Sequence, residues 1–304
     1  MDAPVAGTTT AEQAAPQRRI WLCADDYGIS LAVNTAIRDL VMRGRLNATS
    51  VIAAAPSFNR SEALPLSMLN IASTRVAIGL HVTLTAPFAP LSTDFTPLAD
   101  GAFLPLKDLL RQAMLRRLNR EALAAEVATQ FKTFHTAFGR MPDFVDGHQH
   151  VQLFPQIRDA VLHAAKENAP EAWARQCGSA LPFARRLTDR KGLLLDLLSR
   201  QFRRSAERLG VRVNPAFAGT YEFGSSRHFR DRFPRFLERM PDGGVVMCHP
   251  GFVDAELQRL DPLTTQREHE HAFFMSEEFP RILASHGITL TGSVPDHAPV
   301  PATA

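Results

Sequence analysis

Short apolar runs alternate along this chain with longer segments in which apolar residues recur every three to four positions. The apolar runs lie at 19–24, 49–52, 76–85, 143–146, 173–175, 211–213, 244–248 and 288–290. The segments with helical spacing lie between them, at 61–72, 120–138, 155–167, 228–239 and 266–286. Short apolar runs are typical of buried strands, whereas the longer spacing is typical of helices with one buried face. The pattern therefore predicts about eight strands that alternate with helices.

Two details of this pattern bear on the organisation. Ser30 is a suitable N-cap for a helix that ends at Gly44 and carries on one face the apolar residues Val33, Ile37, Leu40 and Val41. Residues 86–106 contain four prolines and little periodicity, which predicts a long loop. A long irregular insertion of this kind is often a lid or a substrate-binding loop.

The alternation of strands and helices calls for a parallel sheet. At 304 residues, a closed or distorted (β/α) barrel of seven to eight strands is favoured over an open doubly wound sheet. The Gly-x-Gly-x-x-Gly signature of dinucleotide binding is absent after the first strand, which also counts against the open sheet. We expect one α/β domain over 19–292, a disordered leader over 1–18 and a flexible tail over 293–304.

Composition adds the cellular setting. Three cysteines, Cys23, Cys177 and Cys248, show no metal-site or redox spacing, and so small and odd a number favours a reducing compartment. No apolar run approaches the roughly 20 residues that a membrane-spanning helix needs. The sequence contains no nucleic-acid-binding motif. We expect a cytoplasmic protein, and a homodimer is one assembly that the sequence leaves open.

Positive charge is concentrated in one segment. Residues 185–208 hold eight basic and three acidic residues, interleaved with leucines, in a chain whose net charge is only +3. The pattern predicts an amphipathic basic helix. Such a helix is compatible with a solvated face, with peripheral contact to an anionic membrane and with contact to an acidic substrate.

The most informative polar cluster is Asp146-Gly-His148-Gln-His150, which follows the apolar pair Phe144-Val145. If the chain is extended there, alternate residues point the same way, and Asp146, His148 and His150 share one face. Carboxylate and imidazole are ligand types that zinc and similar divalent ions use. The alternative is a surface turn that happens to be rich in histidine.

Further ligand-type residues follow other predicted strands. Asp25 and Asp26 come directly after the first strand, and His81 ends an apolar strand. Adjacent residues of a strand face opposite ways, so both aspartates can reach one site only if the chain turns, and Gly28 makes a turn there plausible. Taken singly, the aspartate pair could cap a helix and His81 could be structural. At neighbouring strand ends they predict one polar site.

The other histidines differ in how well the sequence places them to join this site. His249 follows the apolar strand 244–248 and is held in a turn by a proline and a glycine, so we expect it at the same end of the barrel. An imidazole with its ordinary pKa of about 6.5 can supply a proton at neutral pH. His269 and His271 lie two apart on a predicted helix and diverge by about 200°, so they cannot chelate one ion. His135 is expected to be a core or boundary histidine.

Four motifs follow one another at intervals that, taken together, are specific: Ala24-Asp25-Asp26-Tyr27-Gly28, Ile78-Gly79-Leu80-His81-Val82-Thr83-Leu84-Thr85, Val145-Asp146-Gly147-His148-Gln149-His150-Val151 and Met247-Cys248-His249-Pro250-Gly251-Phe252. The series resembles that of the YdjC-like carbohydrate deacetylases, a family that includes chitooligosaccharide and hopanoid-associated deacetylases. The resemblance covers about 19–292. Tyr27 stands where the family more usually has Phe, and the basic insertion at 185–208 has no counterpart that we can place in the chitooligosaccharide enzymes.

The resemblance implies a distorted (β/α) barrel, one divalent ion (Mg²⁺ or Zn²⁺) and removal of an N-acetyl group from a sugar or glycolipid. By position, the metal ligands would be Asp26, His81 and His148, with Asp25 as the base and His249 as the acid. Asp146, His150 and Arg175 are expected to bind substrate or to support the ligands, and His150 is the one rival ligand. Two alternatives stay open: a glycoside hydrolase with a carboxylate pair, and a non-catalytic sugar- or lipid-binding barrel.

Overall fold

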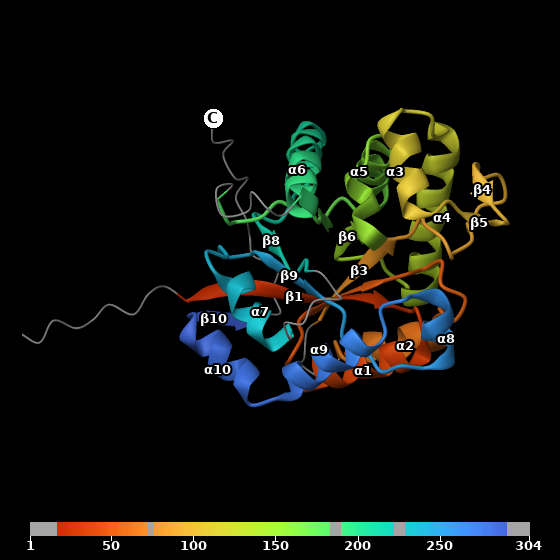
Figure 1. Cartoon of the computed structure of the whole chain (residues 1–304). Helices are drawn as coiled ribbons and strands as arrows, with labels where there is room; N and C mark the ends of the chain where they lie inside the picture. Colours follow the sequence, from red (N-terminus) through yellow and green to blue (C-terminus); the bar gives the residue numbers. More distant parts are fainter. Residues whose placement is uncertain (1–16, 72–75, 183–189, 222–228, 291–304) are drawn as a thin grey trace, which may run out of the picture.

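A computed structural model describes residues 17–71, 76–182, 190–221 and 229–290 of the chain (Figure 1). Its main feature is a curled parallel sheet in the order β7-β6-β3-β2-β1-β9-β8, with β10 paired to the first residues of β1. The strands are β1 (Arg18–Tyr27), β2 (Ala48–Val51), β3 (Ala77–Val82), β6 (Phe144–Gly147), β7 (Trp173–Ala174), β8 (Phe217–Ala218), β9 (Val245–Cys248) and β10 (Ile288–Leu290).

The sheet forms a curled half-barrel and, over the described residues, does not close. This confirms the prediction of a distorted barrel. Its edge strands β7 and β8 have two residues each and do not pair with one another. Helix α6 (Arg190–Leu209) lies between them in the chain, and Val213 makes one isolated parallel bridge to Ala174 of β7. Every residue of β2, β3, β6 and β9 is buried, as expected for parallel strands with both faces covered.

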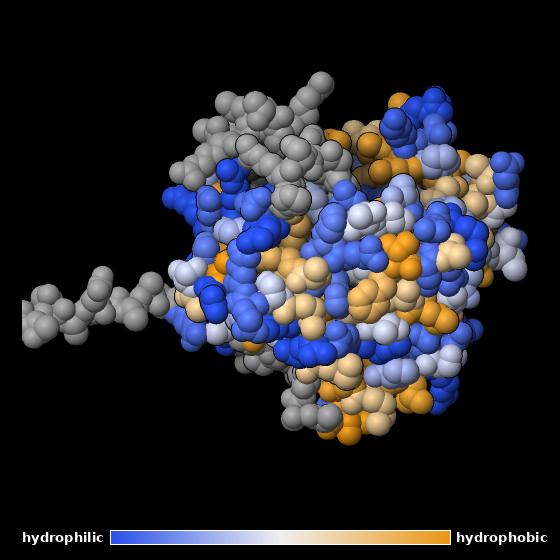
Figure 2. Space-filling model, turned by 60° about the horizontal axis from the view of Figure 1, so that its bottom comes forward, coloured by the Kyte–Doolittle hydropathy of each residue, from blue (hydrophilic) through white to orange (hydrophobic). Residues whose placement is uncertain are grey.

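Helices cover the sheet on both sides (Figure 1). One group comprises α3 (Leu106–Met114), α4 (Arg120–Phe138), α5 (Ile157–Asn168) and α6 (Arg190–Leu209). The other comprises α1 (Leu31–Met42), α2 (Arg60–Met68), α7 (Phe229–Leu237), α8 (Ala255–Leu260), α9 (Thr265–Met275) and α10 (Glu278–Ser285). Among the described residues, none of the helices combines the length and apolar character of a membrane span. On the face that Figure 2 shows, hydrophobic side chains are interspersed with hydrophilic ones.

Several helix limits agree with the prediction. Ser30 caps α1 by accepting a hydrogen bond from the Val33 backbone N–H, and the predicted apolar face of α1 is buried. The helix at 120–138 has the predicted limits and ends at Gly139, which adopts the left-handed conformation that favours glycine. His135, however, is exposed on α4, so its prediction as a core or boundary residue is wrong.

Other elements differ from the prediction. The loop at 86–106 contains a small hairpin, β4 (Leu98–Ala99) with β5 (Ala102–Phe103), and the buried Glu126 carboxylate fixes the loop by accepting bonds from the Leu91 and Ser92 backbone N–H groups. Residues 211–213 make only the isolated bridge, because the sheet edge is formed by β8 further along. The segment 266–286 divides into α9 and α10, and the short helices α3 and α8 were not predicted.

The predicted ends of the domain are tested only in part. Arg18, assigned to the leader, belongs to β1 and pairs with Ile288 of β10. The rest of the predicted leader up to residue 16, and the predicted tail 293–304, lie outside the described residues, as do 185–189 of the basic segment. Within α6, Leu194 and Leu197 are 40% and 57% exposed. Contact of this helix with a membrane stays a prediction.

Candidate active site

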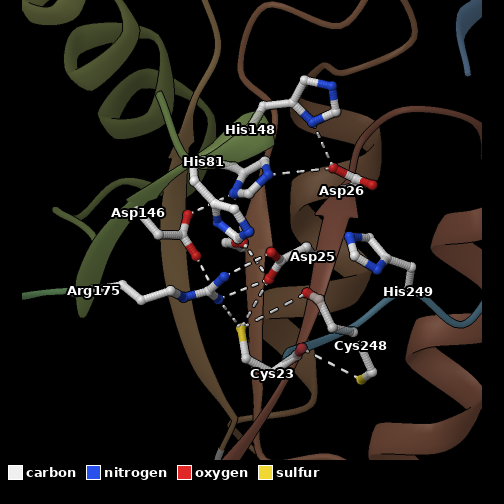
Figure 3. A network of polar contacts seen from close by, with 12 residues as sticks. Cys23, Asp25, Asp26, His81, Asp146, His148, Arg175, Cys248 and His249 are labelled. Carbon is white, nitrogen blue, oxygen red and sulfur yellow. Dashed lines mark hydrogen bonds and ion pairs between the residues drawn. The ribbon is translucent and has the colours of Figure 1, made fainter. Parts of the chain in front are cut away.

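A bulge at the end of β1 brings two adjacent carboxylates to one site. The pairing of β1 with β2 shifts register between Ala24 and Tyr27. Asp26 has a φ of 70°, in the left-handed region that few non-glycine residues adopt. Because the bulge breaks the strict alternation of the strand, Asp25 and Asp26 both turn into the buried space at the carboxyl ends of the strands (Figure 3). The turn expected at this point is therefore present.

Asp26, His81 and His148 form a compact group of buried ligand-type side chains. One ligand atom from each lies within 4.8 Å of the other two. Asp26 Oδ1 is 3.3 Å from His81 Nε2 and 3.1 Å from His148 Nδ1. The residues come from the ends of β1 and β3 and from the turn after β6 (Figure 3). The structure thus brings together the three residues expected to bind metal.

The contacts of His81 orient its ring so that Nε2 is the nitrogen available to a cation. Its Nδ1 is 2.6 Å from Asp146 Oδ1 and 3.0 Å from Ser50 Oγ. Burial lowers the pKa of His81, but the Asp146 carboxylate outweighs it and raises the pKa to about 10. A proton on Nδ1 is donated to the Asp146 carboxylate, and Nε2 faces Asp26. A carboxylate that accepts a proton from one ring nitrogen in this way commonly supports a histidine that binds metal through the other. This donor set fits a divalent ion such as Zn²⁺ or Mg²⁺.

Asp25 is held by a buried arginine. Arg175 Nη1 is 2.6 Å from Asp25 Oδ2, and Arg175 Nη2 is 2.7 Å from Asp25 Oδ1. The same guanidinium lies 2.5 Å from Asp146 Oδ2. Burial would raise the pKa of Asp25, but the charge of Arg175 holds it at about 2. Asp25 is therefore ionised, and Arg175, itself fully buried, supports carboxylates and does not face solvent.

His249 lies on the opposite side of Asp25 from Arg175 and Asp146 (Figure 3). It follows β9, is half-buried, and its backbone N–H donates to Glu270 at 2.6 Å. Burial lowers the pKa of His249 below its ordinary value, whereas the nearby carboxylates of Asp26 and Asp25 oppose the shift. Less of the imidazole is protonated at neutral pH than the sequence alone predicts.

His150 is placed differently from the prediction. The chain is extended only as far as Gly147, and residues His148–Leu153 form the short 3-10 helix η1. Gln149 and His150 both have positive φ values, so the chain turns and His150 does not share a face with His148. Its Nδ1 lies 3.6 Å from Cys177 Sγ, and its ring packs edge-on against Phe217. The Asp146 carboxylate contacts Nδ1 of His81, the ring nitrogen that does not face Asp26, which is the position expected for a residue that supports a ligand.

Three contributors were not singled out from the sequence: Ser50, Arg267 and Glu270. Ser50 lies in the predicted second strand, and its hydroxyl is 3.3 Å from Asp25 Oδ1. Arg267 and Glu270 are buried residues of α9, in the same segment 267–271 that contains His269 and His271. His269 is exposed and His271 lies 3.6 Å from Asp39, so neither joins a ligand cluster within the described part of the chain. The sequence does contain one indication that Arg267 and Glu270 act together, since residues three apart on a helix lie on the same face.

Comparison with known proteins decides the family. A family model described as YdjC-like protein matches residues 19–285. The chain belongs to the YdjC-like family. A protein of Klebsiella pneumoniae subsp. pneumoniae named chitooligosaccharide deacetylase is 28% identical over 238 residues, covering 78% of this chain and 83% of that one. A protein of Yersinia pestis with the same name is 29% identical over 238 residues, covering 77% and 82%.

Solved structures support the fold of this YdjC-like protein. A protein of Enterococcus faecalis V583, described as a proposed cellobiose-phosphate cleavage protein, aligns with a TM-score of 0.69 at 22% identity and covers 90% of this chain and 97% of its own. A lactam utilization protein of Thermus thermophilus aligns with a TM-score of 0.51 at 16% identity, covering 90% and 100%. Both similarities extend over nearly the whole described part of the chain.

Proposed function

We propose that this YdjC-like protein is a metal-dependent hydrolase that removes the N-acetyl group from an acetylated amino sugar. The observation that carries the proposal is the site itself. A two-histidine, one-carboxylate group lies beside an ionised aspartate, with a separate imidazole across from it. The relatives named chitooligosaccharide deacetylase support the substrate class. The sugar that bears the acetyl group would be an oligosaccharide or the head of a glycolipid.

The reaction cleaves one amide C–N bond with one water and yields acetate and an amine. A divalent ion held by Asp26, His81 and His148 would, when bound, polarise a carbonyl oxygen and lower the pKa of a water. Asp25 would take a proton from the attacking water, since Arg175 keeps its carboxylate ionised and oriented.

The amine must gain a proton before it leaves, and His249 would supply it. This imidazole lies on the opposite side of Asp25 from Arg175 (Figure 3). Burial lowers the pKa of His249 and so disfavours the protonated form that would act as the acid. The carboxylates of Asp26 and Asp25 favour that form.

The carboxylates argue against a glycoside hydrolase. Such an enzyme needs one carboxyl group that keeps its proton near neutral pH. The pKa values of Asp25 and Asp26 both lie below their ordinary value. Burial raises the pKa of Glu270 to about 7, but its two oxygens accept bonds from the Tyr221 hydroxyl and the His249 backbone N–H. None of these carboxyl groups is placed to act as that acid.

Acetate release tests the proposal. The purified protein is offered N-acetylated chito-oligosaccharides and N-acetylated glycolipids, first in EDTA and then with Zn²⁺ or Mg²⁺ restored. We expect acetate only with metal, and none from His148→Ala, while His269→Ala, which changes an exposed histidine outside the site, behaves as wild type. New reducing ends formed in EDTA would instead indicate a glycosidase. Binding without acetate or new ends would indicate a non-catalytic protein.

A further inference from the structure

Helix α9 carries two fully buried charged side chains one turn apart. Arg267 and Glu270 each have 0% exposure, whereas Glu268 and His269 between them are exposed. Residues three apart on a helix share a face, so both side chains reach toward the same end of the sheet. Burying charge is costly unless each group finds partners. The partners of this pair include two residues of the candidate active site, Asp26 and His249.

Arg267 binds the outer oxygen of the ligand Asp26. Its Nη2 is 2.6 Å from Asp26 Oδ2 and 2.7 Å from Asp261 Oδ2, and its Nε donates to the Leu263 carbonyl at 3.0 Å. The other oxygen, Asp26 Oδ1, faces His81 and His148. The guanidinium therefore holds one oxygen of the Asp26 carboxylate and leaves the other for the cation.

Glu270 and the backbone of α9 hold the turn that carries His249. Glu270 Oε2 accepts the His249 backbone N–H at 2.6 Å, while Oε1 accepts the Tyr221 hydroxyl at 2.5 Å. The Arg267 carbonyl accepts the Gly251 N–H at 3.1 Å. A Cβ at Gly251 would come within 3.3 Å of Arg267 Cδ, so the turn packs closely on the helix.

We propose that α9 is a positioning helix for the active site, in which Arg267 orients the metal ligand Asp26 and Glu270 orients His249. Asp26 lies at the end of β1 and His249 directly follows β9, and these neighbouring strands are paired at Ala24 and Cys248. One helix attached to both strand ends sets the separation between the cation and the leaving-group side. The assignment rests on the proposed function, but its Arg267 half concerns metal binding alone.

The Arg267 half is tested by titrating metal-free protein with Zn²⁺ in a calorimeter, without substrate. An arginine that acted only by its charge would weaken cation binding, so Arg267→Gln would then bind Zn²⁺ more tightly. A positioning arginine predicts the reverse, a loss of about 10–100-fold. Arg267→Lys, which keeps the charge but lacks the planar fork, should also bind more weakly.

Glu268→Gln, an exposed change two positions from Glu270 on the same helix, is the matched control and should bind as wild type. Circular dichroism identifies any variant that has not folded. If Arg267→Gln fails to fold, Arg267→Lys decides alone. Affinity within about twofold of wild type, or tighter, in the folded variant overturns this half of the proposal.

The Glu270 half is tested by comparing Glu270→Leu with Glu270→Gln. Leucine cannot accept the His249 N–H, so we expect kcat to fall at least about 10-fold with KM and Zn²⁺ affinity unchanged. Glutamine retains an acceptor oxygen and should restore most of kcat. Equal loss in both variants, or wild-type turnover in Glu270→Leu, overturns the role.

Failure of the proposed function would be recognised separately. If wild-type protein releases acetate from no substrate, the deacetylase proposal fails, whereas the zinc titration still decides the Arg267 half. The Glu270 half is then decided by a crystal structure of Glu270→Leu. A His249 ring displaced relative to Asp26 supports positioning, and an unmoved ring overturns it.

Discussion

Replacing Arg175 by methionine should destabilise the protein strongly, because it leaves two carboxylates buried without their partner. Arg175 makes contacts of 2.6 and 2.7 Å to Asp25 and 2.5 Å to Asp146, with all three side chains at most 3% exposed. Removing one partner of a buried ion pair costs about 3–5 kcal/mol. For a folded unit of about 270 residues, this corresponds to a fall in Tm of about 5–9 °C.

The assay is thermal and urea unfolding in EDTA at pH 7, so that bound metal does not contribute. Arg140→Met is the matched control, since Arg140 pairs with Asp143 at 3.1 Å and its side chain is 37% exposed. An exposed pair of this kind contributes at most about 1 kcal/mol. The contrast between the two variants isolates the effect of burial from the effect of losing an arginine.

The loss should also depend on pH. In the wild type the pKa of Asp25 is held at about 2, below its ordinary 3.8, so its contribution to stability is full above pH 3.8 and is lost as the pH falls through 2. In Arg175→Met the guanidinium no longer opposes burial, so this pKa rises above its wild-type value. The difference in unfolding free energy is therefore largest near pH 7 and narrows toward pH 4. An equal difference at both pH values, or one below about 1 kcal/mol at pH 7, would refute the reasoning.

Three further outcomes are expected. Asp25→Asn should keep zinc affinity but lose most acetate release, because the amide cannot accept the water's proton, and near-normal turnover would remove Asp25 from the mechanism. His81→Ala and His148→Ala should each lose bound zinc by metal analysis, whereas zinc retained in both would exclude this ligand set. His249→Ala should leave zinc affinity unchanged and lower kcat at least about 10²-fold, and loss of zinc together with activity would make His249 a ligand instead.

The strand ends explain why much of the site could be predicted. Asp25, His81, His148 and His249 each stand beside an apolar run, and parallel strands bring their carboxyl ends to one edge. Local pattern was sufficient there because a buried strand is marked by its own residues. The prediction that His150 shares a face with His148 is wrong, because it assumed that the strand continued, whereas the chain turns at Gln149 and His150, which both have positive φ values.

What the sequence could not reveal are the long-range partners. Arg175 pairs with Asp25 across 150 positions, and Arg267 pairs with Asp26 across 241. Periodicity predicts neither pairing, because it indicates which face of an element is apolar and not which charged residue lies opposite. The edge strand β8 was missed for a similar reason, because two residues, Phe217 and Ala218, carry too little pattern.

The charges of the site also explain why a cation suits it. Four carboxylates, from Asp25, Asp26, Asp146 and Asp261, contact two buried guanidiniums, from Arg175 and Arg267. The carboxylates therefore outnumber the guanidiniums, and negative charge is left over in a region of low dielectric, where an unpaired charge is costly. Without metal the compensation comes from a proton on His81, whose pKa is raised to about 10. A divalent cation between Asp26, His81 and His148 would take over that role and release the proton, so the arginines that order the carboxylates also leave the residual charge that favours a metal ion.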